Sequence, residues 1–161
     1  MILLYLDQNY LSGIVKRKPG FRELEPVLRT AVARGAVGVP ESRAHRLESE
    51  PRPDLPLLEL VRDLSRGLRL PDELDARERG YRARLALVAA DHFPERRRLQ
   101  SDPVDLDAIA LALSRCQLVT CDAFMADVVR RTRLDALREV ALYTGRRADV
   151  DRLRRRLQEL V

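Results

Sequence analysis

Four short apolar runs, separated by longer stretches of helical periodicity, constrain the fold of this chain most. The strands predicted from them are residues 2–6, 36–39, 117–121 and 140–143. Between them, apolar residues recur three and four positions apart, which predicts helices over 9–14, 21–34, 41–50, 57–64, within 71–98, and over 104–115, 124–131 and 149–161. Continuous apolar strands that alternate with helices are typical of a parallel sheet covered on both faces. The sequence therefore predicts an α/β fold.

Length and composition favour one ordinary globular domain. The chain has 161 residues, of which 45% are hydrophobic, and this is enough to bury a core without disulfides or a metal. No apolar stretch is long enough to span a membrane, and no basic region precedes an apolar one as in a signal peptide, so we expect a cytoplasmic protein. Cys116 and Cys121 lack the partners of a zinc site, and we expect both to be reduced core residues.

The charge balance leaves two interpretations open. The formal net charge is +5, and only Lys16 and Lys18 among the basic residues are lysines. A basic surface is typical of proteins with a polyanionic partner, but an excess of arginine beside abundant alanine and leucine is also typical of GC-rich coding sequence. The triplet Arg96, Arg97 and Arg98 fits a nucleic-acid patch, although a solvated helix face is the favoured interpretation.

Carboxylates follow two of the predicted strands. Asp7 comes directly after the run 2–6, and Asp122 follows 117–121 in the same way. Ligands of parallel sheets bind at the carboxyl ends of the strands, so these two side chains face each other if the strands are neighbours. Asn9 is in a position to cap the short helix that follows Asp7.

A third acidic group lies in the stretch SDPVDLDAIALAL, where Asp102, Asp105 and Asp107 stand at the start of a helix. Carboxylates there complement the helix dipole and cap free amides, which is the expected role of Asp102 or Asp107. Asp105 stands one turn before Ile109 on the apolar stripe, so its side chain is expected to point toward the sheet. The choice of the functional acid among the three stays open by one helical turn.

The stretch ESRAHRLE contains the fourth candidate. On a helix over 41–50, Glu41, His45 and Glu48 share one face. With a carboxylate one turn away on each side, His45 fits either the orientation of a neighbouring ligand or an ordinary surface ion pair.

Several carboxylates that converge in one crevice need a counter-charge. Mg²⁺ or Mn²⁺ supplies it, because these cations prefer oxygen ligands and bind substrate phosphate in their remaining positions. The chemistry that follows is hydrolysis of phosphodiester bonds, so the acidic residues predict a nuclease.

Four motifs, in their order along the chain, resemble the successive acidic motifs of PIN-domain ribonucleases: YLDQN, SRAHRLE, DPVDLDAIALAL and LVTCDAF. The resemblance extends over about residues 1–143. It implies a three-layer sandwich around a central parallel sheet, a Mg²⁺ or Mn²⁺ cofactor, and RNA as the substrate. Matched motif by motif, it implies a catalytic set made of Asp7, Glu48, Asp105 and Asp122, with metal held by the three aspartates.

The same resemblance implies supporting roles for neighbouring residues. Asn9 would help to hold the first loop, and Thr120 would orient Asp122. Asp102 is a further supporting candidate. Ser42 and His45 match an S-x-x-H-x-x-E arrangement found in a PIN-like subgroup. The chain departs from the family pattern at Gln8, where many members have Thr or Ser.

The sequence disfavours two other functional classes. A receiver-type signalling domain needs a late lysine, but no lysine follows Lys18, and the chain contains no phosphate-binding P-loop. The main alternative is a catalytically inactive PIN-like module that binds RNA or a protein. A toxin with a cognate antitoxin partner is a second alternative within the nuclease class.

Two further segments have expected roles. The stretch 51–98 carries no family motif and could form a clamp over the site. The amphipathic helix at 149–161 could either provide a homodimer surface or complete the core.

Overall fold

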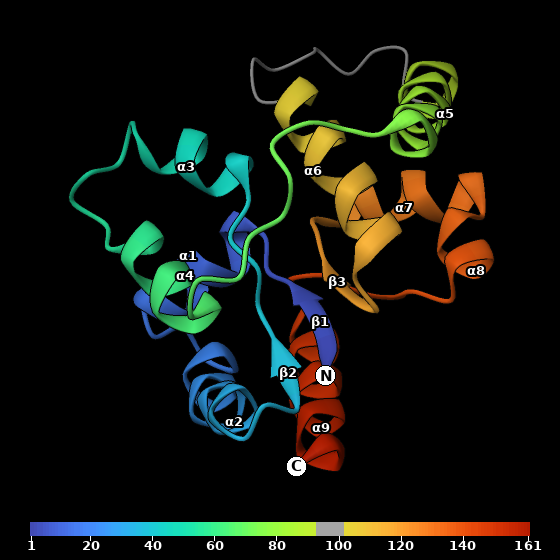
Figure 1. Cartoon of the computed structure of the whole chain (residues 1–161). Coiled ribbons are helices and arrows are strands. Elements are labelled where there is room, and N and C mark those ends of the chain that lie inside the picture. Colours follow the sequence, from blue (N-terminus) through green and yellow to red (C-terminus); the bar gives the residue numbers. More distant parts are fainter. Residues whose placement is uncertain (93–101) are drawn as a thin grey trace.

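The computed structural model describes residues 1–92 and 102–161, and its strands form one four-stranded parallel sheet (Figure 1). The strands are β1 (Ile2–Tyr5), β2 (Val37–Gly38), β3 (Leu118–Thr120) and β4 (Ala141–Tyr143), in the order β2-β1-β3-β4. β1 pairs with β3 through Tyr5 and Val119, so their carboxyl ends lie at the same edge of the sheet. The four predicted strands are confirmed, each slightly shorter than its apolar run.

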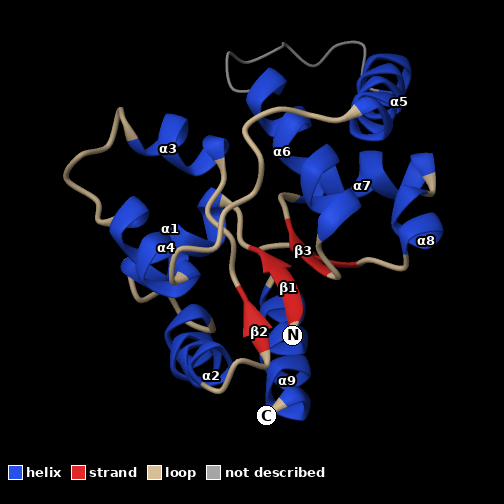
Figure 2. Cartoon of the chain, in the orientation of Figure 1, coloured by secondary structure: helices blue, strands red, loops and turns tan. Residues whose placement is uncertain are grey.

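Helices connect the strands and cover both faces of the sheet. Those in the described residues are α1 (Gln8–Val15), α2 (Phe21–Ala33), α3 (Arg43–Ser49), α4 (Leu57–Ser65), α5 (Ala76–His92), α6 (Asp102–Arg115), α7 (Ala123–Thr132), α8 (Leu134–Arg138) and α9 (Arg147–Leu160). Figure 2 shows the strands between two groups of helices. The sequence prediction lacked only α8.

The sheet separates two hydrophobic clusters, because successive side chains of a strand point to opposite faces. Leu4 and Leu6 belong to the cluster built with α1, α2, α4 and α9. Tyr5 belongs to the cluster built with α5, α6, α7 and α8. The arrangement confirms the α/β class and is consistent with a three-layer sandwich.

The predicted amphipathic helix at the carboxyl end packs into the first cluster. α9 lies against α2 and buries Val150, Leu153 and Leu157. One of its two expected roles, completion of the core, is therefore present. Homodimer formation stays a prediction.

The described part of the predicted clamp, residues 51–92, is divided between the two faces of the sheet. α4 packs against α1 and α3, whereas α5 packs against α6 and α7 on the other side of the sheet. Pro51 and Arg52 line the cleft described below. The triplet at 96–98 lies outside the described residues.

No helix in the described ranges combines the length and apolar character needed to cross a bilayer.

One predicted helix begins later than expected. α3 starts at Arg43 rather than at Glu41, because the Ser42 hydroxyl oxygen accepts a hydrogen bond from the His45 backbone N–H and so caps the helix. Glu41 lies before the helix in an extended segment that bridges to Arg69. The prediction that Glu41 shares a helix face with His45 was therefore wrong.

Candidate active site

A cleft of about 560 Å³ lies at the carboxyl ends of β1 and β3. All four predicted acids line it. The described residues around it are Tyr5, Asp7, Gln8, Asn9, Ser12, Leu47, Glu48, Pro51, Arg52, Val104, Asp105, Ala108, Ile109, Cys121, Asp122 and Met125. Side chains from β1, α1, α3, α6 and α7 or their flanks thus meet in one place.

Asp7 caps α1 and is held from two sides. Its Oδ1 accepts hydrogen bonds from the Tyr10 backbone N–H at 3.2 Å and from the Thr120 hydroxyl at 2.8 Å. Burial and, to a lesser extent, the charge of Asp122 raise the pKa of this carboxyl to about 6, although the two hydrogen bonds act in the opposite direction. Its second oxygen, Oδ2, has no hydrogen bond to any described residue.

Asp122 repeats this arrangement at the neighbouring strand. It caps α7, and its Oδ1 accepts a hydrogen bond from the Met125 backbone N–H at 2.7 Å. Its Oδ2 makes no hydrogen bond within the described part of the chain. The expectation that Asp7 and Asp122 lie at adjacent strand ends is confirmed by the pairing of β1 with β3.

Glu48 and Asp105 meet across the cleft from α3 and α6, and their carboxyl groups share a hydrogen bond. Two carboxyl groups form such a bond only when one of them carries a proton. Burial, this hydrogen bond and the charges of Asp105 and Asp7 raise the pKa of Glu48 to about 8. The pair therefore holds a proton near neutral pH.

The structure distinguishes Asp105 from Asp107 on α6. Asp105 lines the cleft, whereas Asp107 pairs with Arg82 at 2.5 Å and does not line it. Asp107 also lies well inside α6, which begins at Asp102, so the prediction that Asp107 caps the helix was wrong. The side chain of Asp102 lies outside the described residues.

Two sequence predictions near the acids were wrong: the acid that Thr120 orients and the capping role of Asn9. The Thr120 hydroxyl donates to Asp7 and not to Asp122, because Thr120 is the last residue of β3 and lies beside the loop that leaves β1. Asn9 does not cap α1, since Asp7 already occupies that position, and Asn9 lies exposed at the cleft instead.

His45 orients the backbone beside Asp7. Its Nδ1 accepts a hydrogen bond from the Ser42 N–H at 2.9 Å, so Nε2 carries the proton and donates to the Leu6 carbonyl at 2.6 Å. The ring stacks on Tyr5, and its burial lowers the pKa of His45 and keeps it neutral. Its hydrogen bonds are to the backbone of Ser42 and Leu6, and the predicted orientation of a neighbouring ligand stays a prediction. The surface ion pair was wrong, because the ring is buried.

An ion-pair cluster around Glu41 is one feature that the sequence did not indicate. This carboxylate is 1% exposed and binds Arg62 at 2.7 Å, Arg46 at 2.9 Å and Arg69 at 3.3 Å. Burial alone would raise the pKa of Glu41, but the hydrogen bonds from Arg62 and Arg46 hold it below its usual value. The cluster ties the segment before α3 to α4, and no short-range spacing could have revealed these partners.

Gln8 is a second unexpected feature. Its Nε2 and Oε1 atoms are buried at the cleft, and neither has a hydrogen-bond partner among the described residues. Cys121 also borders the cleft. Both cysteines are buried and neither forms a disulfide, as predicted.

The carboxylate and amide oxygens of the cleft lining are the kind of ligand that a hard divalent cation prefers. In residues 1–92 and 102–161, however, no three His, Cys, Asp or Glu side chains are grouped as a ready metal site. Mg²⁺ does not require such a group, because it commonly binds through one or two carboxylates and fills its remaining positions with water and substrate phosphate. The pair Asp7 and Asp122 meets this smaller requirement, because the Oδ2 atom of each makes no hydrogen bond to the described residues.

Comparison of the chain with family models, with curated proteins and with solved structures gives no match.

Proposed function

We propose that this chain is a metal-dependent nuclease that hydrolyses phosphodiester bonds in RNA. The observation that carries the proposal is the convergence of four carboxylates on one cleft at the carboxyl ends of two adjacent strands. They come from four separate segments of the chain: Asp7, Glu48, Asp105 and Asp122. Burial of like charges is unfavourable unless a cation offsets it, which the raised pKa values of Asp7 and Glu48 reflect.

Asp7 and Asp122 are the residues proposed to hold Mg²⁺ or Mn²⁺, and a role for Asp105 as a third ligand stays a prediction. When bound, the cation supplies a Lewis acid that activates water and stabilises negative charge on the phosphate. Asp7 and Asp122 suit this role, because each uses Oδ1 to cap a helix while its Oδ2 makes no hydrogen bond to the described residues. The amino ends of α1 and α7 begin beside these carboxylates, and helix amino ends favour bound phosphate.

Glu48 is proposed to act as the general base that accepts a proton from the attacking water. Its carboxyl holds a proton jointly with Asp105 near neutral pH, so a small change in nearby charge is enough to ionise it. Once ionised, the Glu48 carboxylate can accept a proton from water. Neutral His45 acts one step away, by fixing the backbone of Leu6 next to Asp7.

RNA is the favoured substrate for two reasons. The motifs that contain the four acids resemble those of PIN-domain ribonucleases, for which RNA is the usual substrate. The net charge of +5 also favours association with a polyanion.

A second candidate function is a PIN-like module that binds RNA or a protein without cleavage. The observation that favours it is the lack of a grouped set of three metal-ligating side chains in the described ranges. Incubation of RNA with the protein and Mn²⁺ distinguishes the two functions. A nuclease cleaves the RNA, whereas a binding module leaves it intact.

Cleavage of a panel of structured RNAs in Mn²⁺ tests the proposal. Asp7→Asn and Asp122→Asn should each lower the cleavage rate at least about a hundredfold, because a catalytic metal contributes several kcal/mol of transition-state stabilisation. Asparagine is a good helix cap, so both variants should still fold. Asp107→Asn is the matched control, since its carboxylate pairs with Arg82 away from the cleft lining. Full activity in both cleft variants would contradict the proposal.

A further inference from the structure

The cleft has a strongly unbalanced charge. Four acids line it, and Arg52 alone is basic among the described residues around it. An RNA strand brings several phosphates, and a metal at the acids offsets the charge of only the nearest one. The neighbouring phosphates need a cation from the protein.

Arg52 is held in place by its backbone. Its N–H donates to the Ser49 carbonyl at 3.1 Å, and its own carbonyl accepts from the Leu55 N–H at 3.1 Å. Pro51 and Pro53 flank it, and each ring restricts the backbone further. Arg52 therefore sits on a constrained turn and not on a loose loop, which reduces the entropy lost on binding.

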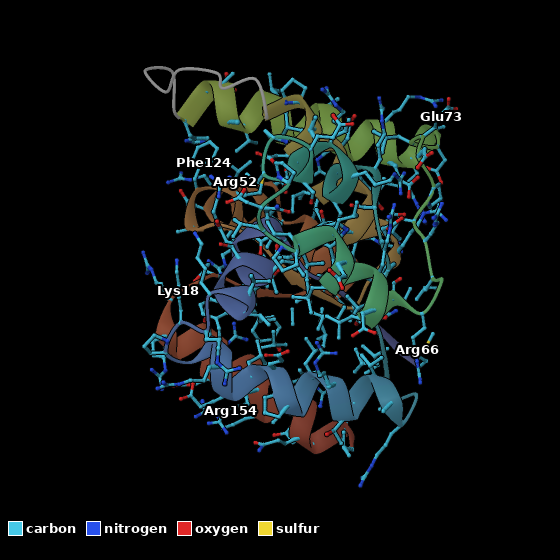
Figure 3. All side chains as sticks on the ribbon, turned by 90° about the vertical axis from the view of Figure 1, so that its left-hand side faces the viewer. Lys18, Arg52, Arg66, Glu73, Phe124 and Arg154 are labelled. Atoms are coloured by element: carbon cyan, nitrogen blue, oxygen red, sulfur yellow. The ribbon has the colours of Figure 1, made fainter. Side chains whose placement is uncertain are left out.

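The guanidinium of Arg52 is available to a ligand. The side chain is exposed and forms no ion pair or hydrogen bond with the described residues. Arg46 and Arg62 differ in this respect, because Glu41 engages both. Figure 3, which is viewed from the left-hand side of Figure 1, labels Arg52 in the segment between α3 and α4.

We propose that Arg52 binds a phosphate of the RNA strand adjacent to the phosphate that meets the acids, and so positions the strand in the cleft. A guanidinium donates two parallel hydrogen bonds to a phosphate, which fixes orientation as well as charge. Arg52 is a positioning residue in this role, since it does not contact the reacting bond. The inference rests on the proposed function and names how that site recognises its substrate.

Salt-dependent RNA binding tests this role. A labelled single-stranded RNA is titrated with Asp7→Asn protein, which should not cleave it, and with the same protein carrying Arg52→Ala. Loss of one charged phosphate contact should weaken binding about tenfold at low salt and reduce the slope of log K against log salt by about 0.7, the value for one phosphate of a single strand. Arg52→Lys should restore most of the slope but less of the affinity.

Arg155→Ala is the matched control, because Arg155 is exposed on α9 and does not line the cleft. It should bind RNA as the parent does. In the cleaving protein, Arg52→Ala should raise KM about tenfold and leave kcat within about twofold, the pattern of lost substrate binding.

The possible failures can be told apart. RNA that is bound and cleaved, with an affinity and a salt slope that Arg52→Ala does not change, overturns the role of Arg52 and leaves the nuclease intact. RNA that is neither bound nor cleaved by any version of the protein overturns the proposed function and this inference with it.

Discussion

Asp7 and Asp122 each combine two tasks within one carboxyl group. The Oδ1 atom of each caps a helix, and the Oδ2 atom has no hydrogen bond to the described protein. Helix capping is worth about 1 kcal/mol, so these aspartates have a structural reason to be present as well as a chemical one. A carboxylate at the end of a buried strand is thereby explained by the helix that follows and by the cleft beside it.

The proton shared by Glu48 and Asp105 predicts an unusual pH dependence of stability. The folded protein holds this proton up to about pH 8, whereas the unfolded chain releases it near the ordinary value of 4.5. Between these values the folded state binds more protons, so its free energy of unfolding falls as pH rises. Glu48→Gln should reduce that fall by more than about 1 kcal/mol, the equivalent of one pKa unit.

Urea unfolding of metal-free protein at about pH 5 and about pH 8.5 measures this effect. Glu50→Gln is the control, because Glu50 is exposed and does not line the cleft. Equal pH dependence in the wild type and Glu48→Gln would contradict the shared proton.

At the scale of elements, the position of α1 depends on its contact with α2. A Cβ atom on Gly13 would lie 2.6 Å from Cγ of Phe21, and Phe21 also packs edge-on against Tyr10 at a centroid distance of 5.1 Å. Tyr10 in turn donates its backbone N–H to Asp7. Close packing of the two helices therefore supports the first acid of the cleft.

Gly13→Ala should destabilise the protein by about 1–2 kcal/mol, because overpacking outweighs the helix propensity that alanine gains. Gly80→Ala on α5 is the matched substitution, since no atom lies within 4 Å of its added Cβ. It should stabilise the protein by up to about 1 kcal/mol. Urea midpoints measure both changes, and a stability gain in Gly13→Ala would show that α1 and α2 are less tightly packed than the structure indicates.

For the whole molecule, the sequence was sufficient to predict the sheet and the location of the cleft. Continuous apolar runs such as 2–6 specify burial on both faces, and polar residues that follow such runs mark the edge where ligands bind. Asp7 and Asp122 could be found in this way, because their position depends only on local pattern.

Features set by distant segments could not be predicted. Thr120 bonds to Asp7 because of the register between β1 and β3, which no local pattern contains. The Glu41 carboxylate forms ion pairs with Arg62 of α4 and with Arg69 in the extended segment after α4. The sequence prediction began α1 at Asn9 and α3 at Glu41, whereas the structure begins them at Gln8 and Arg43. Several polar residues near each start could cap the helix, and only the backbone geometry selects one.

The central claim is that the cleft binds a divalent cation through Asp7 and its neighbours. Calorimetric titration of Mn²⁺ into the wild type and into Asp7→Asn at neutral pH tests it most directly, because it needs no knowledge of the RNA. We predict saturable binding to the wild type that Asp7→Asn abolishes or weakens at least about tenfold, as expected for loss of a ligand. Saturable binding of equal affinity in both proteins, or no binding to the wild type, would contradict the claim.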